Sequence, residues 1–145
     1  ITGYYANPNI HPYEEFMRRK GSTAEACKAK GISLITEECY NIQKWKMFES
    51  SCAERCSMCY TVRADMSAKK AAELGFEYYT STLFVSPYQN HDLMKEIFEE
   101  TGKKYGVKFL YRDFREGFRQ GQQQARELGL YRQKYCGCIR SLYGG

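Results

Sequence analysis

The sequence lacks any long apolar run. No stretch approaches the roughly 20 apolar residues that a membrane-spanning helix needs, and the N-terminus has no basic-then-apolar secretory pattern. Internal repeats and low-complexity segments are also absent. We therefore expect a soluble protein with no membrane partner. Its 145 residues suit one domain, 1–145, with a single sizeable core.

Cysteine is present in an odd number, which does not favour a framework of paired disulfides. Four of the seven cysteines form two close pairs, Cys56/Cys59 and Cys136/Cys138. These spacings are more typical of metal or redox sites than of secreted disulfide scaffolds. Cys27 is expected to be a buried thiol, and Cys39 and Cys52 have no assigned role. This cysteine usage fits a reducing cytosol, so we expect a cytoplasmic protein.

Acidic residues are scarce in the last third of the chain. Residues 103–145 contain 10 basic and 3 acidic side chains, a net charge of +7, whereas residues 1–102 contain 12 basic and 14 acidic ones. Aromatic residues are interleaved with these charges, namely Tyr111, Phe114, Phe118, Tyr131 and Tyr135. Charge combined with stacking faces suits a polyanion such as RNA. On charge alone, a solvated basic surface explains the pattern equally well.

Strand-like and helix-like patterns alternate along the chain. Strands are expected at 1–6, 32–36, 76–82 and 107–111, and helices at 12–20, 22–30, 56–75, 93–105 and 118–128. Small residues, including Ala64 and Ala68, give the third helix a narrow face that can pack closely on a sheet. The alternation predicts an α/β fold, a Rossmann-like three-layer sandwich with a mainly parallel sheet flanked by helices. We expect its first strand to lie upstream of this sequence.

Ligands of such folds bind beyond the carboxyl ends of the strands. Asn7, residues 81–89 and residues 113–115 each follow an expected strand, so we expect them to share one rim. Asn9 and His11 lie in the first strand-to-helix connection, where helix capping and substrate contact are equally good explanations. In the third segment, Arg115 is a candidate phosphate or ribose ligand and Asp113 a carboxylate beside a metal. The alternative for these two is a surface ion pair.

The two cysteine pairs carry the strongest chemical signal. Cys56 and Cys59 form a CxxC motif at an expected helix start, where the helix dipole favours the thiolate that binds metals. Gly137 frees the backbone between Cys136 and Cys138, so both sulfurs can face one ion or each other. A disulfide across one residue is strained and reducible, which suits a redox couple. The second alternative is a closed zinc site made by all four sulfurs.

Three long motifs resemble one known family. They are "GYYANPNIHPYEEFMRR", "RCSMCYTVRADMSAKKAAELGFEYYTSTLFVSPYQNH" and "DFREGFRQGQQQARELGLYRQKYCGCIRS". In this order they resemble the QueH-type epoxyqueuosine reductases, over nearly the whole chain apart from residues 24–51. The resemblance implies the last step of queuosine synthesis, which is the reductive removal of an epoxide oxygen from a modified guanosine at the wobble position of tRNA.

The resemblance also implies cofactors. In the family, an adjacent Cys-Cys pair after the first strand joins the CxxC pair in holding an iron–sulfur cluster of the [4Fe–4S] type. Here Cys56 and Cys59 match the CxxC pair, and the Cys-Cys motif is not in this sequence. Cys136 and Cys138 match a family CGC pair, for which a redox disulfide or an additional iron ion is implied.

The resulting hypothesis assigns a role to each candidate residue. Removing an epoxide oxygen as water needs two electrons, which side chains do not supply without redox help, and iron can supply electrons and Lewis acidity. Cys56 and Cys59 would hold the cluster, and Cys136 and Cys138 the second redox centre. Asp113, His11 or Tyr88 would donate protons. The residues expected to bind the tRNA substrate are Asn7, Asn9, Arg63, Tyr88, Arg115, Arg119, Arg132 and Lys134.

The partners implied are a tRNA bearing epoxyqueuosine and an electron donor protein or low-potential reductant. Two rival functions are a zinc-stabilised RNA-binding module and an ATP-dependent tRNA-thiolating enzyme of related fold. The second rival requires a glycine-rich phosphate loop after the first strand. This sequence contains no such loop, but the loop would lie in the expected upstream region.

Overall fold

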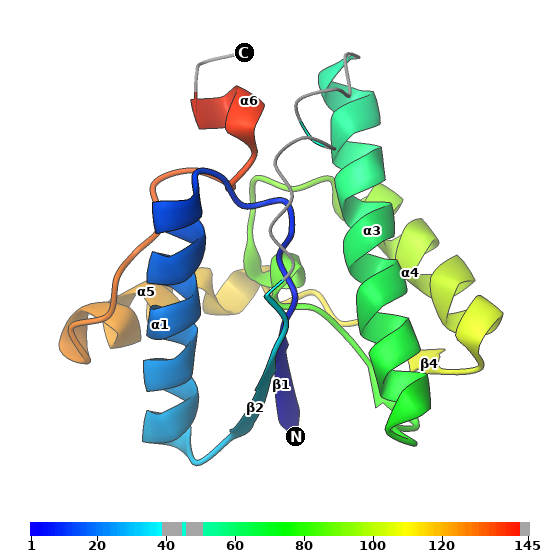
Figure 1. The fold of residues 1–145 in the computed structure, drawn as a ribbon, viewed down its shortest axis with the longest axis horizontal. Coiled ribbons are helices and arrows are strands. Elements are labelled where there is room, and N and C mark those ends of the chain that lie inside the picture. Colours follow the sequence, from blue (N-terminus) through cyan, green and yellow to red (C-terminus); the bar gives the residue numbers. More distant parts are fainter. Residues whose placement is uncertain (39–44, 46–50, 143–145) are drawn as a thin grey trace. The chain divides into compact units, whose positions relative to one another are not determined.

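The structure is a computed structural model that describes residues 1–38, 45 and 51–142 (Figure 1). The chain divides into two compact units, Ile1–Glu49 with Gln122–Gly145 and Ser50–Gly121. Each unit is a mixture of helices with one small parallel sheet, which confirms the α/β class. The described strands form two separate two-stranded sheets, so a three-layer sandwich around one sheet stays a prediction. None of the described helices is long and apolar enough to cross a membrane.

The first unit begins with a β-α-β arrangement. Strand β1 (Thr2–Tyr5) pairs in parallel with β2 (Ser33–Thr36), and helix α1 (Tyr13–Lys30) connects them. The helix ends where Gly31 takes the left-handed conformation, with φ +68°, and Ile32 N–H donates to the Cys27 carbonyl. Two helices at 12–20 and 22–30 were expected here, which is wrong. A helix tolerates an interior glycine such as Gly21 at a cost of only about 1 kcal/mol.

The core of this unit is small. Tyr5, Ile10 and Phe16 pack together, and the Tyr5 hydroxyl donates to the Phe16 carbonyl at 2.8 Å.

Cys27, expected to be buried, is a free thiol that is only partly buried. The end of helix α5 (Phe118–Glu127) and the short helix α6 (Ile139–Leu142) also belong to this unit. Cys39 lies outside the described residues.

The second unit contains helix α3 (Cys52–Glu73), β3 (Tyr78–Tyr79), the 3-10 turn η1 (Thr82–Val85), α4 (His91–Tyr105), β4 (Lys108–Phe109) and the turn η2 (Arg115–Gly117). Strands β3 and β4 pair in parallel and are shorter than expected. Helix α3 begins four residues before the expected start. The reason is a capping box, in which the Ser51 hydroxyl accepts from Glu54 N–H and the Glu54 carboxylate accepts from Ser51 N–H.

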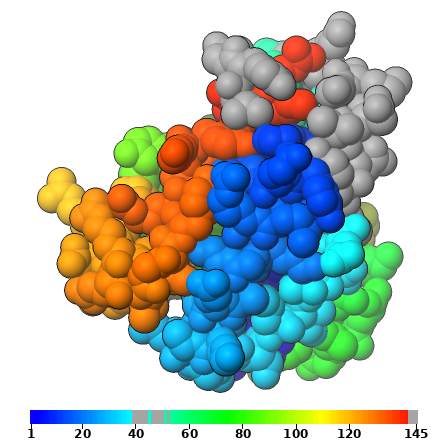
Figure 2. All heavy atoms as spheres, turned by 60° about the vertical axis from the view of Figure 1, so that its left-hand side comes forward, coloured from blue at the N-terminus to red at the C-terminus, as the bar shows by residue number. Residues whose placement is uncertain are grey.

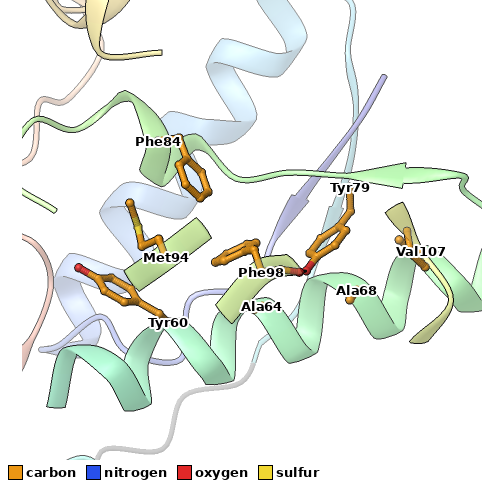
Figure 3. Packing of buried hydrophobic residues seen from close by; sticks show 9 residues of the cluster. Tyr60, Ala64, Ala68, Tyr79, Phe84, Met94, Phe98 and Val107 are labelled. Carbon is orange, nitrogen blue, oxygen red and sulfur yellow. The ribbon is translucent and has the colours of Figure 1, made fainter. Parts of the chain in front are cut away.

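The core of the second unit forms where α3, α4 and β3 meet. Ala64 and Ala68 on α3 are fully buried, as are Met94 and Phe98 on α4. Figure 3 shows these side chains together with Tyr79, whose hydroxyl donates to the Phe98 carbonyl. The expected small-residue face is therefore confirmed. It packs against a helix as well as against a strand.

Glycine at position 102 is required by this packing. A Cβ there would lie 2.5 Å from the Val107 carbonyl oxygen. We expect Gly102→Ala to lower the free energy of unfolding by about 2–3 kcal/mol, because backbone must move to admit the methyl group. Gly121→Ala, at a helical site with no atom within 4 Å, should raise it by about 0.5–1 kcal/mol. Urea denaturation measures both, and an unchanged G102A would contradict the packing.

Candidate functional site

The segment Tyr131–Cys138, here called the CGC segment, docks on α1 and on the loop after β1. His11 N–H donates to the Gly137 carbonyl at 2.9 Å, and the Tyr135 hydroxyl donates to the His11 carbonyl. Figure 2 shows the orange and red-orange atoms of the C-terminal part directly against the blue atoms of α1. The fold thus brings one cysteine pair to a loop that precedes it by more than 100 residues.

A charged pair on α1 anchors this segment. The Arg19 guanidinium donates to Glu15 at 2.8 Å, to the Tyr135 carbonyl at 2.6 Å and to the Cys136 carbonyl at 3.3 Å. Glu15 and Arg19 are both buried, and the Tyr131 hydroxyl lies 2.9 Å from both carboxylate oxygens. Sequence reasoning missed this pair. The sequence pattern that could have indicated the pair is the i, i+4 spacing of opposite charges on one helix.

Gly137 permits the close approach of the segment. Its φ of +103° is a conformation that other residues rarely adopt, and a Cβ would lie 2.9 Å from Ile10 Cγ1. Cys136 is exposed, with its sulfur 3.3 Å from the Ser141 hydroxyl oxygen, and Cys138 is partly buried. Both are free thiols in the structure.

The loop after β1 places the other candidates of this unit. Asn7 is partly buried, and Asn9 and His11 are buried. The Oδ1 atom of Asn9 has no hydrogen-bond partner among the described residues, whereas the His11 ring lies 6.2 Å from the Trp45 ring. Asn9, His11 and the CGC segment therefore gather at one place, which sequence spacing could not show.

Cys56 and Cys59 lie four and seven residues after Cys52, the first residue of α3, so they are beyond the first turn and not at the helix start as expected. They are three residues apart and therefore on neighbouring turns of one face. Both are partly buried, and Cys56 packs against the core of the second unit. The next residue, Tyr60, is buried, and its hydroxyl donates to Gln89 at 2.7 Å and accepts from Asn90 N–H. The start of α3 is thus tied to the loop that leads into α4.

The segments after β3 and β4 lie side by side, as expected for parallel strands, because Phe114 N–H donates to the Phe84 carbonyl at 3.2 Å. The Arg115 guanidinium donates hydrogen bonds to both carboxylate oxygens of Asp113, at donor–acceptor distances of 2.5–3.0 Å. Hydrogen bonds from the Arg115 side chain and backbone hold the pKa of Asp113 well below its usual range. Asp113 is therefore a carboxylate that accepts protons poorly and has none to donate at neutral pH.

His91 is a titratable residue of this region that sequence reasoning missed, although it ends the motif "SPYQNH". Its Nε2 lies 2.9 Å from the Ser86 carbonyl oxygen. A carbonyl only accepts, so Nε2 carries the hydrogen. Its Nδ1 is buried without a hydrogen-bond partner among the described residues.

The expected RNA contacts are mostly exposed. Tyr88 is 83% exposed, with its ring edge-on to that of Phe118 at 6.0 Å. Arg119, Arg132 and Lys134 are exposed, whereas Arg63 is partly buried. An unpredicted contact places the Lys95 ammonium 4.6 Å from the centre of the exposed Tyr111 ring.

The donor set suits iron or another thiophilic metal in part. The free thiols of Cys56 and Cys59 are on neighbouring turns of one helix face, at about 5–6 Å between Cβ atoms, a separation that ligands of two corners of one cluster can have. No group of three or more His, Cys, Asp and Glu side chains is placed to hold a metal within the described ranges. The two cysteine pairs belong to different units, so their convergence on one site stays a prediction.

The buried Glu15 carboxylate gives a pH prediction. Burial raises its pKa, but hydrogen bonds from Arg19 and Tyr131 outweigh this, and the pKa lies below the usual 4.5. Such a carboxylate stabilises the fold above pH 4.5, and this contribution is lost as the pH falls through the folded-state pKa. Glu15→Gln should therefore be less stable than the unchanged chain at pH 7, and the difference should close below about pH 4.5. Urea denaturation between pH 3 and 7 measures it, and a constant difference would contradict the assignment.

Comparison with known proteins gives one consistent result. A family model described as "Epoxyqueuosine reductase QueH" matches residues 1–143. Curated proteins of that name match from Dehalococcoides mccartyi (36% identical, 99% of this chain, 79% of the relative), Streptococcus pyogenes serotype M1 (33%, 96%, 60%) and Thermotoga maritima (32%, 96%, 78%). The matched region includes both cysteine pairs and the α1 charge pair.

Proposed function

This chain belongs to the epoxyqueuosine reductase QueH family, and we propose that it reduces epoxyqueuosine to queuosine at the wobble position of tRNA. The reaction takes up two electrons and two protons, breaks both C–O bonds of the epoxide and releases the oxygen as water. The observation that carries the proposal is the family match over residues 1–143. The docking of the CGC segment on the loop after β1 supports it, because it places the backbone between the two cysteines beside His11, a candidate proton donor.

Cys56 and Cys59 would supply two of the four thiolates of a [4Fe–4S] cluster. When bound, the cluster would supply low-potential electrons. Cys136 and Cys138 would serve as a second redox centre, either as a dithiol or as ligands of an additional iron ion. The proposal includes a three-layer sandwich with a mainly parallel sheet, a cytoplasmic location and an electron donor of low potential.

The chain's own residues would bind the tRNA and manage protons. Arg119, Arg132 and Lys134 are exposed cations suited to phosphates, and Tyr88 offers an exposed ring on which a base can stack. Asp113 is held as a carboxylate by Arg115, so this pair fits substrate positioning better than proton donation. His11 and Tyr88 are the remaining candidates for donating protons to the epoxide oxygen.

The test is turnover by full-length protein purified and reconstituted without oxygen. Incubation with epoxyqueuosine-tRNA and a low-potential reductant should convert the modified nucleoside to one lacking a single oxygen atom, as measured by mass spectrometry. A brown protein containing iron and acid-labile sulfide is expected. A colourless protein with one zinc per chain that binds RNA without converting it would favour the RNA-binding module instead.

A further inference from the structure

We propose that Arg19, held by Glu15, is the positioning residue for the Cys136/Cys138 pair. Arg19 touches neither thiol in any contact that the structure gives. It binds the backbone on both sides of Cys136, through the carbonyls of Tyr135 and Cys136. The catalytic consequence rests on the proposed function, whereas the effect on the thiols themselves does not.

The bonds fix three consecutive peptide planes. Arg19 holds the carbonyls of Tyr135 and Cys136, and His11 N–H holds the carbonyl of Gly137 at 2.9 Å. The direction of a Cα–Cβ bond follows from the two peptide planes that flank it. Both planes flanking Cys136 are therefore held, as is the plane that precedes Cys138. The position of the Cys136 sulfur depends on these bonds more than on packing, since Cys136 is exposed.

The guanidinium geometry explains why the residue is arginine. Its planar fork reaches Glu15 with Nε and two successive carbonyls with Nη1 and Nη2, whereas the lysine ammonium is a single point of charge. The fork also lies against the Tyr135 ring, with its carbon 5.2 Å from the ring centre. A Cβ on residue 137 would lie only 3.2 Å from the Arg19 Nη1 atom. The position of the guanidinium therefore requires glycine at residue 137.

Stability alone is a poor explanation of this arrangement. A buried ion pair is often no more stabilising than a well-packed apolar pair, because desolvation offsets the attraction. Here both charges are buried, at 4% and 8% exposed, and every bond that leaves the pair toward the C-terminal part ends on the CGC segment. The pair is therefore placed to fix the position of this segment.

The test compares Arg19→Lys with Arg18→Lys. Arg18 also binds Glu15, at 3.2 Å, and lies over the Tyr131 ring, but none of its contacts in the described residues reaches a CGC carbonyl. The first readout is the rate of alkylation of each thiol by iodoacetamide, followed by mass spectrometry. The exposed Cys136 should react at least about tenfold faster than Cys138 in the unchanged chain and in R18K. In R19K the ratio should fall below about threefold as the backbone loosens.

The second readout is turnover of the reconstituted full-length enzyme. R19K should lower kcat at least about 100-fold, with the KM for tRNA within about threefold, because misplacement by about 1 Å has such an effect on rate. R18K should retain both constants. Unchanged alkylation ratio and kcat in R19K would overturn the proposal, as would equal losses in R18K. If R19K loses its circular dichroism signal, the E15Q/R19Q variant replaces it in both measurements. This variant removes both buried charges, so neither is left without its partner.

The outcomes separate the two proposals. An unchanged chain that binds iron but does not convert epoxyqueuosine-tRNA would contradict the proposed function. The alkylation ratio would still decide whether Arg19 positions the thiols, because it needs neither cluster nor substrate.

Discussion

Replacing Cys56 or Cys59 with serine is expected to abolish turnover of epoxyqueuosine-tRNA and to remove iron and acid-labile sulfide from the purified protein. A hydroxyl is a far poorer ligand than a thiolate for the iron of such clusters. Changes to outer-shell partners already reduce metal binding or activity about 10–100-fold, so loss of a ligand should reduce kcat at least about 100-fold. Iron and sulfide analysis and the visible absorbance of the cluster measure cofactor loss, and nucleoside mass spectrometry measures turnover.

Cys27→Ser is the matched control. Cys27 is also a partly buried helical cysteine, but it lies on α1 in the other unit. This variant should retain iron, sulfide and turnover. A C59S protein that still carries a full complement of iron and sulfide would contradict the assignment of α3 to the cluster.

Gly137→Ala is expected to have the second large effect. At φ +103° a Cβ costs about 1–3 kcal/mol in local strain, and here it would also lie 2.9 Å from Ile10 Cγ1 and 3.2 Å from Arg19 Nη1. The CGC segment must therefore shift away from α1. We expect the free energy of unfolding to fall by about 2–4 kcal/mol and kcat to fall at least about 100-fold. Urea denaturation and nucleoside mass spectrometry measure the two effects.

Gly129→Ala is the matched control, because it introduces backbone strain without a steric clash. Gly129 lies in the same part of the chain with φ +66°, and a Cβ there meets no atom within 4 Å. Its substitution should cost about 1–2 kcal/mol and leave turnover unchanged. If G137A and G129A behaved alike in turnover, the close docking of the CGC segment would not matter for the reaction.

Much of the local structure could be predicted from residue patterns. The β-branched run at 32–36 and the apolar spacing at 93–105 gave elements that the structure confirms as β2 and α4. These patterns reflect burial on one face of a strand or helix, which depends on neighbours only a few residues away. Two of the misjudged features were the uninterrupted α1 and the early start of α3, where tolerance of an interior glycine and a capping box outweighed the apolar pattern.

Some residues of the candidate site could be recognised from the sequence, and others could not. Cys136 and Cys138 were chosen as candidates from their spacing alone, because a CGC motif has few structural uses, and their role stays a prediction. Glu15 and Arg19 were not singled out, because an i, i+4 pair of opposite charges is common on exposed helices. Only their burial beneath the CGC segment distinguishes them.

By itself the sequence determined which atoms are available for chemistry, namely four paired thiols and a basic, aromatic C-terminal third, because side-chain chemistry needs no fold to be recognised. Only the tertiary structure decided that the CGC segment lies on α1 and that a buried guanidinium holds its carbonyls. The reason is that contacts across more than 100 residues follow from burial and close packing of the whole unit, and no periodicity within the chain records them.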